Sequence, residues 1–263
     1  MKLAIQEHLL AGHTTLERFQ HAKTLGLDGV EVKVDAEFDA RIGDVADAVA
    51  QTGLSVAALN VGHNTLIHPH PDQREAALRL IRQSLSWSVD LDTAGVVFMG
   101  HYAPHPVLPD LAPYKSAVEL EAELLIRQLS ATLCDFALAI GANLLLEHAS
   151  PADTHLLSRA AYANVVREKL HQHPHLFITA NIYHMQAAGD SPAETLPTLR
   201  DAVRYVHLSD NMHSLNLDSA ETAAIVSALN TMGYAGWVTL EAASAKKDQL
   251  SKAVVTLQEL LRH

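Results

Sequence analysis

The chain has 263 residues, 48% of them hydrophobic, which is enough for a sizeable core in a domain of ordinary size. Its 30 acidic residues outnumber 19 Lys and Arg residues, giving a formal charge of −11 with no basic run, which argues against a nucleic-acid partner. Cys134 is alone and cannot form an internal disulfide, and no segment has the apolar length needed to cross a bilayer, so we expect a soluble, unexported, cytoplasmic protein with no membrane partner.

Strand and helix patterns alternate along the whole chain. Short, almost continuous apolar runs predict strands near residues 2–6, 29–34, 54–61, 95–99, 143–147, 176–181, 203–208 and 237–241. Helical patterns fill the gaps, and the longest lie near 72–90 and 114–139. Continuous apolarity is typical of parallel strands that are covered on both faces. The order therefore predicts an α/β protein, a single-domain (β/α)8 TIM barrel over residues 1–263.

Glycines recur where a predicted helix gives way to the next strand. Gly26, Gly141 and Gly233 each stand at such a joint, where a helix commonly ends in a left-handed residue. The chain thus repeats a βα unit. A doubly wound open sheet is the competing architecture, but no G-x-G-x-x-G follows the first strand, and eight units exceed its usual count.

Six successive strands end on residues that can bind a metal or move a proton. These residues are His63, His101, Glu147, Asn181 with His184, His207 with Asp210, and Glu241. A parallel barrel brings the carboxyl ends of all its strands to one mouth, so side chains far apart in sequence meet there. The pattern predicts one active site at that mouth.

Four segments resemble a known family. ANLLLEH, TANIYHM, VRYVHLSDN and GYAGWVTLE are similar to the xylose isomerase-like TIM barrels, which include sugar epimerases, hydroxypyruvate isomerases, inosose dehydratases and a DNA-repair endonuclease. The resemblance implies a divalent metal, Mn²⁺, Mg²⁺ or Zn²⁺, held at the strand ends. The residues that match the ligands are Glu147, Asn181, His207 and Glu241, separated by 34, 26 and 34 residues.

One of the four positions departs from the family. Where the family has aspartate, this chain has Asn181, which can offer an amide oxygen but no charge. The site would then present two carboxylates to a divalent ion in place of three, so we expect weak metal binding.

The chemistry of the family explains why two glutamates are needed. Isomerising or epimerising a hydroxy-ketone removes a proton from a carbon beside a carbonyl, and a Lewis-acidic ion stabilises the resulting enediolate. Two carboxylates then serve as base and acid on opposite faces of that planar intermediate. Glu147 and Glu241, on the fifth and eighth strands, are the predicted catalytic pair.

The resemblance also implies a set of substrate-binding residues. His184 matches a histidine that contacts substrate oxygens, His213 stands where epimerases often carry arginine, and Asp153 stands where they commonly have a glutamate. Asp153 could equally be an acidic residue at a helix N-terminus. For His184, an ordinary loop histidine is the less favoured alternative. His63 and His101 match extra metal-binding histidines of the endonuclease, but we expect them to line the sugar pocket.

Two further acidic residues are open to interpretation. Asp210 follows His207 closely and could orient it or cap the next segment. Glu31 and Lys33 alternate on the second strand, and pairing with each other is the safer interpretation, because a buried charge needs a partner.

The sequence favours a metal-assisted isomerase or epimerase that acts on a small sugar or sugar derivative. An inosose-type dehydratase, which expels water from the same enolate, is the alternative within enzymes. The non-enzymatic alternative is a sugar-binding barrel that has lost full metal ligation, and Asn181 is its main support. DNA repair is disfavoured by the charge and by the missing aspartate. A homo-oligomer is compatible with the sequence, which identifies neither the sugar nor the metal.

Overall fold

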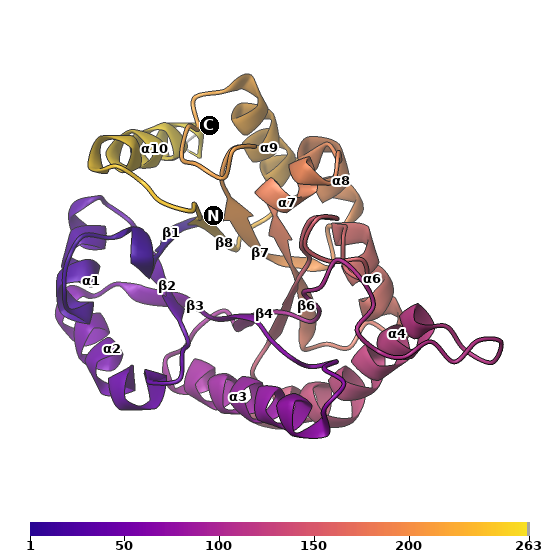
Figure 1. The fold of residues 1–263 in the computed structure, drawn as a ribbon. Coiled ribbons are helices and arrows are strands. Elements are labelled where there is room, and N and C mark those ends of the chain that lie inside the picture. Colours follow the sequence, from indigo (N-terminus) through magenta and orange to yellow (C-terminus); the bar gives the residue numbers. More distant parts are fainter. Residues whose placement is uncertain (262–263) are drawn as a thin grey trace.

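The computed structural model describes residues 1–261, and its centre is a closed barrel of eight parallel strands in sequential order, from β1 to β8 (Figure 1). The strands are β1 Lys2–Gln6, β2 Gly29–Lys33, β3 Ser55–His63, β4 Val96–Met99, β5 Leu144–Glu147, β6 Leu176–Asn181, β7 Val203–Leu208 and β8 Trp237–Leu240. The predicted TIM barrel is therefore confirmed, with strand positions close to those expected. Residues 262 and 263, which the expected single domain included, lie outside the described residues.

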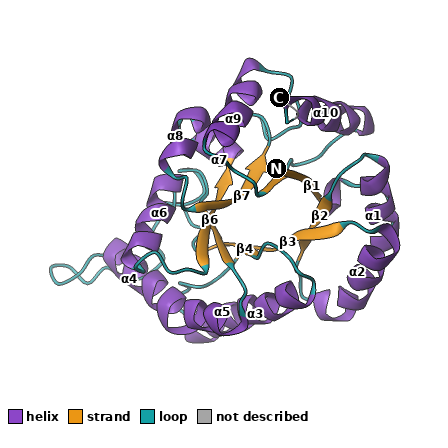
Figure 2. Ribbon diagram, turned by 180° about the vertical axis from the view of Figure 1, so that it is seen from behind, coloured by secondary structure: helices purple, strands orange, loops and turns teal. Residues whose placement is uncertain are grey.

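Helices form a ring around the barrel (Figure 2). They are α1 Thr15–Thr24, α2 Phe38–Thr52, α3 Pro71–Asp90, α4 Ala117–Gln128, α5 Asp135–Ile140, α6 Ala160–Lys169, α7 Ile182–Ala187, α8 Pro192–Thr198, α9 Ala220–Thr231 and α10 Lys247–Leu260. The helix expected over 114–139 is interrupted, because residues Leu129–Cys134 form a π-helical segment between α4 and α5. Among residues 1–261, no helix combines the length and apolarity required to span a bilayer.

Two layers of apolar side chains hold the barrel together. The larger layer lies between strands and helices and includes Phe19, Phe38 and Ile81, all fully buried. The smaller one includes Ala4, Ala57, Ala58, Val97, Leu145, Tyr205 and Trp237. These strand residues belong to the barrel's own core, which is packed with side chains in this fold.

The chain reverses between helix and strand at the predicted glycines. Gly26, Gly141 and Gly233 have φ angles of 74°, 76° and 69°, in the left-handed region that glycine adopts without a steric penalty. Gly29, at the start of β2, serves packing: a Cβ there would lie 2.7 Å from the ring of Trp237. These short reversals return the chain to the amino end of the barrel, so the longer loops gather at the carboxyl end.

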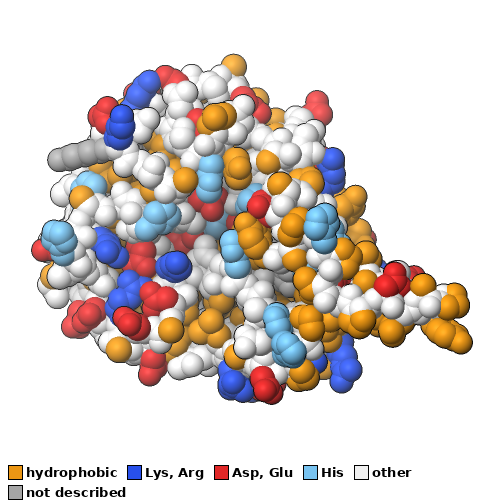
Figure 3. All heavy atoms as spheres, in the orientation of Figure 1, with side chains coloured by type: hydrophobic (Ala, Val, Ile, Leu, Met, Phe, Trp, Pro, Cys, Tyr) orange, Lys and Arg blue, Asp and Glu red, His pale blue; other side chains and the backbone are white. Residues whose placement is uncertain are grey.

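The longest of these loops projects away from the barrel. It connects β4 to α4 and contains a bridge between Leu111 and Lys115, and it protrudes beyond α4 in Figure 1. Tyr114, near its tip, is 92% exposed. At the mouth itself, Figure 3 shows a hollow in which acidic and histidine side chains gather.

Candidate active site

The carboxyl ends of the strands bring the predicted metal ligands together. Glu147 ends β5, Asn181 ends β6, His207 lies in β7, and Glu241 directly follows β8. One ligand atom each from Glu147, His207 and Glu241 lies within 4.8 Å of the others. Nδ1 of His207 is 2.7 Å from Oε1 of Glu147 and 3.9 Å from Oε2 of Glu241. We call these three residues, with Glu31, the mouth cluster.

The residue on the other side of His207 is Glu31, from β2. Oε2 of Glu31 lies 2.6 Å from Nε2 of His207, and both side chains are almost completely buried. The side-chain amides of Gln6 and Asn60 donate to Oε1 of Glu31, over 2.9 and 2.7 Å. The expected pairing of Glu31 with Lys33 is therefore wrong: Glu31 pairs with a histidine 176 residues away in sequence.

Asn181 sits between the two predicted catalytic glutamates. Its Nδ2 donates to Oε1 of Glu147 at 2.8 Å and to Oε2 of Glu241 at 2.7 Å. Its Oδ1 accepts the backbone N–H of His184 at 3.1 Å, which caps the start of α7. The amide nitrogen thus faces the carboxylates, whereas a ligand to a cation must present the oxygen. Ligation by Asn181 stays a prediction, and it requires the reversed amide orientation.

The charges of the mouth cluster are strongly interdependent. Burial disfavours ionisation of Glu147, but the attraction of His207 outweighs it and lowers the pKa of Glu147 to about 2. Burial and the charges of Glu147 and Glu31 raise the pKa of Glu241 to about 7, against the attraction of His207. The three carboxylates raise the pKa of His207 well above its usual value despite burial. Without an ion, an imidazolium lies between carboxylates.

The same donors fit a divalent cation. Nε2–H of His207 donates to Glu31, which leaves Nδ1 directed toward the carboxylates of Glu147 and Glu241. This is the carboxylate–histidine arrangement that commonly fixes the tautomer and raises the basicity of a metal-binding imidazole. Two carboxylates and one imidazole form a mixed oxygen and nitrogen set, which suits several divalent ions and discriminates poorly among them.

His184 and Asp153 form one wall of the mouth. His184 is buried, and its Nδ1 lies 3.7 Å from Oδ2 of Asp153. Asp153 also accepts hydrogen bonds from the hydroxyl groups of Tyr102, at 3.0 Å, and Ser150, at 2.5 Å. The helix-terminus interpretation of Asp153 is wrong, because the next helix begins only at Ala160.

His63 and His213 each stack on a tyrosine. The ring of His63 lies 3.4 Å from that of Tyr102, centroid to centroid, and the ring of His213 lies 4.5 Å from that of Tyr183. Nε2 of His213 is also 3.9 Å from Oε2 of Glu241. Burial lowers the pKa of His63 and of His213, so neither provides the permanent charge of an arginine.

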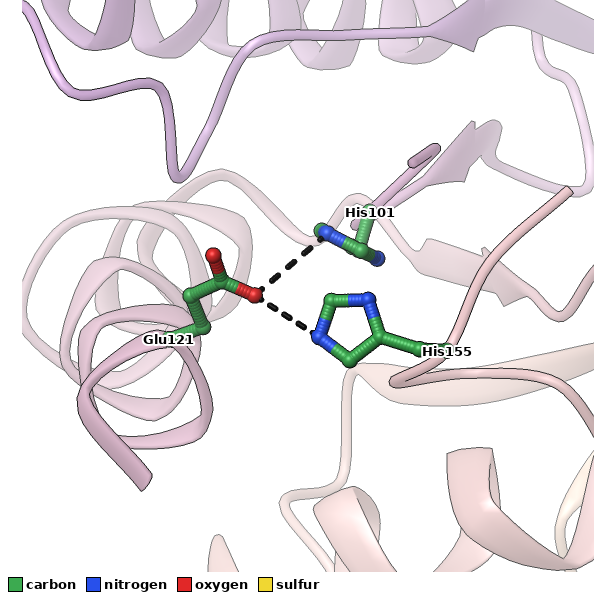
Figure 4. A group of neighbouring side chains, drawn as sticks. All are labelled: His101, Glu121 and His155. Atoms are coloured by element: carbon green, nitrogen blue, oxygen red, sulfur yellow. Dashed lines mark ion pairs between the residues drawn. The ribbon is translucent and has the colours of Figure 1, made fainter. Parts of the chain in front are cut away.

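His101 does not accompany the other predicted substrate-binding residues. It is almost fully buried, and its ring is directed toward Glu121 of α4, beside His155 (Figure 4). These three side chains, which we call the lateral cluster, offer ligand atoms within 4.8 Å of one another.

A cavity adjoins the mouth cluster on the side of the first three strands. It has a volume of about 440 Å³, within the range typical of small-molecule sites. It is lined by Gln6, Glu7, His8, Glu31, Lys33, Asn60 and Gly62. Sequence patterns did not single out Gln6, Asn60 or His8. The signal that could have found Gln6 and Asn60 is their position at the ends of predicted strands, whereas His8 lies beyond the first strand.

Asp210 caps a turn, and none of its hydrogen bonds within residues 1–261 is to His207. Its Oδ1 accepts the backbone N–H groups of Met212 and Ser214, and its Oδ2 accepts the hydroxyl of Ser214. Of the two interpretations that the sequence left open, the structure supports the cap.

A comparison with known protein families matches residues 19–262 to the xylose isomerase-like TIM barrel. The match covers more than half of the chain, so the chain belongs to this family. The resemblance seen in four short segments is thereby confirmed for nearly the whole sequence.

Individual relatives are distant in sequence but match most or all of the chain. The chain is 24% identical to 3-dehydro-D-guloside 4-epimerase of Escherichia coli strain K12 over 246 residues, which are 92% of both chains. Among solved structures, it is similar to apo 3-keto-D-glucoside 4-epimerase from E. coli, with a TM-score of 0.86, 23% identity and complete coverage of both chains. It is also similar to D-psicose 3-epimerase with D-tagatose from Clostridium cellulolyticum H10, with a TM-score of 0.82, 16% identity and coverage of 100% and 98%.

Proposed function

We propose that this member of the xylose isomerase-like TIM barrel family is an epimerase or isomerase that moves a proton beside the carbonyl of a small sugar. One observation carries the proposal: two glutamates that are distant in sequence, Glu147 and Glu241, converge on one buried histidine at the barrel mouth. Relatives named as epimerases of keto-sugars support a ketone-bearing substrate.

The reaction needs two carboxylates on different sides of the reacting carbon. One takes the proton as the C–H bond breaks, and the bonding electrons move into the carbonyl to give an enediolate. The other returns a proton to the opposite face, which inverts the centre. Glu147 and Glu241 reach the mouth from β5 and from beyond β8, and Asn181 donates to both of them. We assign them as base and acid.

Glu147, His207 and Glu241 would hold the divalent ion, which we propose to be Mn²⁺, Mg²⁺ or Zn²⁺. When bound, such an ion stabilises negative charge that develops on a substrate oxygen. Glu31 keeps Nδ1 of His207 turned toward the centre through its contact with Nε2. Asn181 would join as a fourth ligand if its amide reversed.

Polar side chains around the mouth would position the sugar hydroxyl groups. We assign this role to Asp153 and His184 on one wall and to His63 and His213 on their tyrosine platforms. The cavity beside β1, β2 and β3 has room for the remainder of the sugar. A cytoplasmic location and a single domain stay predictions from the sequence.

Deuterium exchange tests the proposed function directly. The metal-supplemented protein is incubated in D2O with ketoses, inososes and 3-keto-glucosides, and the products are followed by mass spectrometry and NMR. We expect one deuterium beside the carbonyl, together with the epimer or isomer. Loss of one water from the ligand would instead establish dehydration. Binding of a sugar without any exchange would establish the non-catalytic alternative.

A further inference from the structure

The lateral cluster joins three segments that are distant in sequence. His101 lies just beyond the end of β4, Glu121 belongs to α4, and His155 belongs to the loop between β5 and α6 (Figure 4). Oε2 of Glu121 lies 2.8 Å from Nε2 of His155 and 3.7 Å from Nε2 of His101. Neither contact is aligned as a hydrogen bond, so these three buried atoms have no hydrogen-bond partner.

The second nitrogen of His155 fixes the proton distribution in the ring. Nδ1 of His155 is 3.1 Å from the backbone carbonyl oxygen of Ala103, which can only accept, so Nδ1 must carry a proton. A neutral His155 then presents a lone pair at Nε2 toward the carboxylate of Glu121, which also only accepts. Two acceptors 2.8 Å apart repel each other unless a proton or a metal ion lies between them.

Among the side chains that the structure describes, no Lys or Arg pairs with Glu121 to provide that cation. Its side chain is fully buried, and Oε1 accepts the backbone N–H groups of Val107 and Leu108. No Lys or Arg ion pair to it is found among residues 1–261, where its ion-pair contacts are the two histidines alone. A buried carboxylate that lacks a compensating charge is strongly disfavoured.

The spacing of the three atoms suits one ion. Ligand atoms about 2.0–2.2 Å from a tetrahedral zinc ion lie about 3.3–3.6 Å from one another. The measured separations of 2.8 and 3.7 Å bracket that value, and all three atoms lie within 4.8 Å of each other. The second ring nitrogen of each histidine is also held. Nδ1 of His101 is hydrogen-bonded to the hydroxyl of Thr154, as Nδ1 of His155 is to the carbonyl oxygen of Ala103.

We infer that Nε2 of His101, Nε2 of His155 and Oε2 of Glu121 form a second divalent-cation site, for Zn²⁺, separate in its ligands from the mouth cluster. Two imidazoles and one carboxylate are a donor set that zinc commonly takes. The small cavity of about 100 Å³ that borders His101 offers space for a water as the fourth ligand.

The ion would act as a clamp. It ties the residues after β4 to α4 and to the loop after β5, and these two loops carry Tyr102 and Asp153 to the mouth. Its effect on the mouth is therefore one of positioning. The site requires no assumption about which sugar the mouth accepts.

Zinc stoichiometry tests the site apart from the mouth. The Glu147→Gln variant weakens the mouth cluster, and after demetallation, reloading and desalting we expect it to retain about one zinc per chain. Adding His155→Ala should remove that zinc. Adding His105→Ala, a matched change at an exposed histidine of the loop that carries His101, should leave it bound.

A second pair of variants tests the carboxylate. Glu121→Gln keeps size and an acceptor for Val107 and Leu108, and it should raise the zinc dissociation constant at least about tenfold, because a charged ligand is lost. Glu123→Gln, two residues along α4 and largely exposed, is its control and should have no effect. With Co²⁺ in place of zinc, the visible absorption of a low-coordinate ion should appear in the Glu123→Gln variant and weaken in the Glu121→Gln variant.

Hydrogen–deuterium exchange covers the case in which a variant does not fold. In the Glu147→Gln variant, zinc should slow amide exchange in segments 102–109 and 153–157 relative to the metal-free form. The inference is overturned if folded Glu147→Gln binds no zinc, if His155→Ala and His105→Ala retain equal amounts, or if zinc leaves exchange in both segments unchanged. Any of these results would mean that a shared proton, and not a metal, bridges the cluster.

Discussion

The mouth cluster and the lateral cluster use the same two kinds of side chain in opposite proportions. At the mouth, the carboxylates of Glu31, Glu147 and Glu241 surround one imidazole. In the lateral cluster, two imidazoles share the one carboxylate of Glu121. The ratio decides where protons reside, because each carboxylate favours a protonated histidine and each further histidine disfavours it.

The outcome differs accordingly. At the mouth, the pKa of His207 is raised well above its usual value in spite of burial. In the lateral cluster, burial and the neighbouring His155 lower the pKa of His101 to about 4, against the attraction of Glu121. Without a bound cation, His207 therefore holds its proton, whereas His101 keeps a lone pair free. The same side-chain type, histidine, thus has opposite protonation in the two clusters because its neighbours differ.

Removing a mouth carboxylate should have the largest effect. Glu147→Gln or Glu241→Gln preserves size but abolishes the base or acid, so deuterium exchange into substrate should fall by about 100-fold or more. The rates are measured with the ion in excess, since both residues are also proposed ligands. Glu75→Gln, an exposed glutamate on α3, is the control. Near wild-type turnover in either mouth variant would contradict the two-glutamate mechanism.

Changing Glu31 should weaken metal binding at the mouth alone. Glu31→Gln removes the charge that holds Nε2–H of His207, so the affinity of the mouth for Mn²⁺ should drop by about 10–100-fold. Zinc binding by the lateral cluster should be unaffected, so the zinc affinity of the same variant serves as the internal control. Titration calorimetry with both ions measures the two sites. Equal losses at both would mean that the two clusters are not independent.

The lateral cluster should make the metal-free protein sensitive to mild acid. The pKa of His101 is about 4 when folded, whereas an unfolded histidine titrates near 6.5. Between pH 6.5 and pH 4, His101 is protonated in the unfolded chain but not in the folded one. Its contribution to the free energy of unfolding is therefore fully present above about pH 6.5 and is lost as the pH falls toward 4. The free energy of unfolding should decrease by about 2 kcal/mol from pH 7 to pH 5 on this account.

Urea denaturation with a chelator present measures this change. A His101→Gln variant lacks the titrating group, so its stability should vary less over the same interval. If both proteins lose stability in parallel, protonation of His101 is not the cause.

Adding a third carboxylate ligand at the mouth should have the smallest effect of the four changes. Asn181→Asp adds a carboxylate beside Glu147 and Glu241, and it should tighten Mn²⁺ binding by about tenfold through the added attraction. Without an ion, the same variant should be less stable than the wild type, because the two hydrogen bonds from Nδ2 are replaced by repulsion. Calorimetry and thermal unfolding measure both. Unchanged or weaker binding would place residue 181 outside the metal shell.

The sequence predicted those parts of the molecule that follow from local pattern. Apolar runs located the strands, and the residues that end those runs located Glu147, Asn181, His207 and Glu241, because every parallel strand ends at the same mouth. Neither inference required knowledge of a distant contact.

Contacts between distant segments could not be predicted in this way. Glu31 was expected to pair with its neighbour Lys33, yet its partner is on β7. Glu121 lies within an amphipathic helix, where a glutamate ordinarily faces water, and only the structure shows that it is fully buried. The orientation of the Asn181 amide depends on the backbone of the following helix as well as on the carboxylates.

The pairing of β1 with β8 also governs when the site can exist during synthesis of the chain. Lys2 pairs with Trp237, so the barrel cannot close before the chain has been made through β8. Glu31 leaves the ribosome 176 residues ahead of the histidine that compensates its charge. Until then, burying Glu31 and Glu147 is costly, and the edges of the unfinished sheet remain open to other chains. A nascent or truncated chain that lacks β8 is therefore prone to misfolding and aggregation, and the active centre can assemble only once β8 has been made.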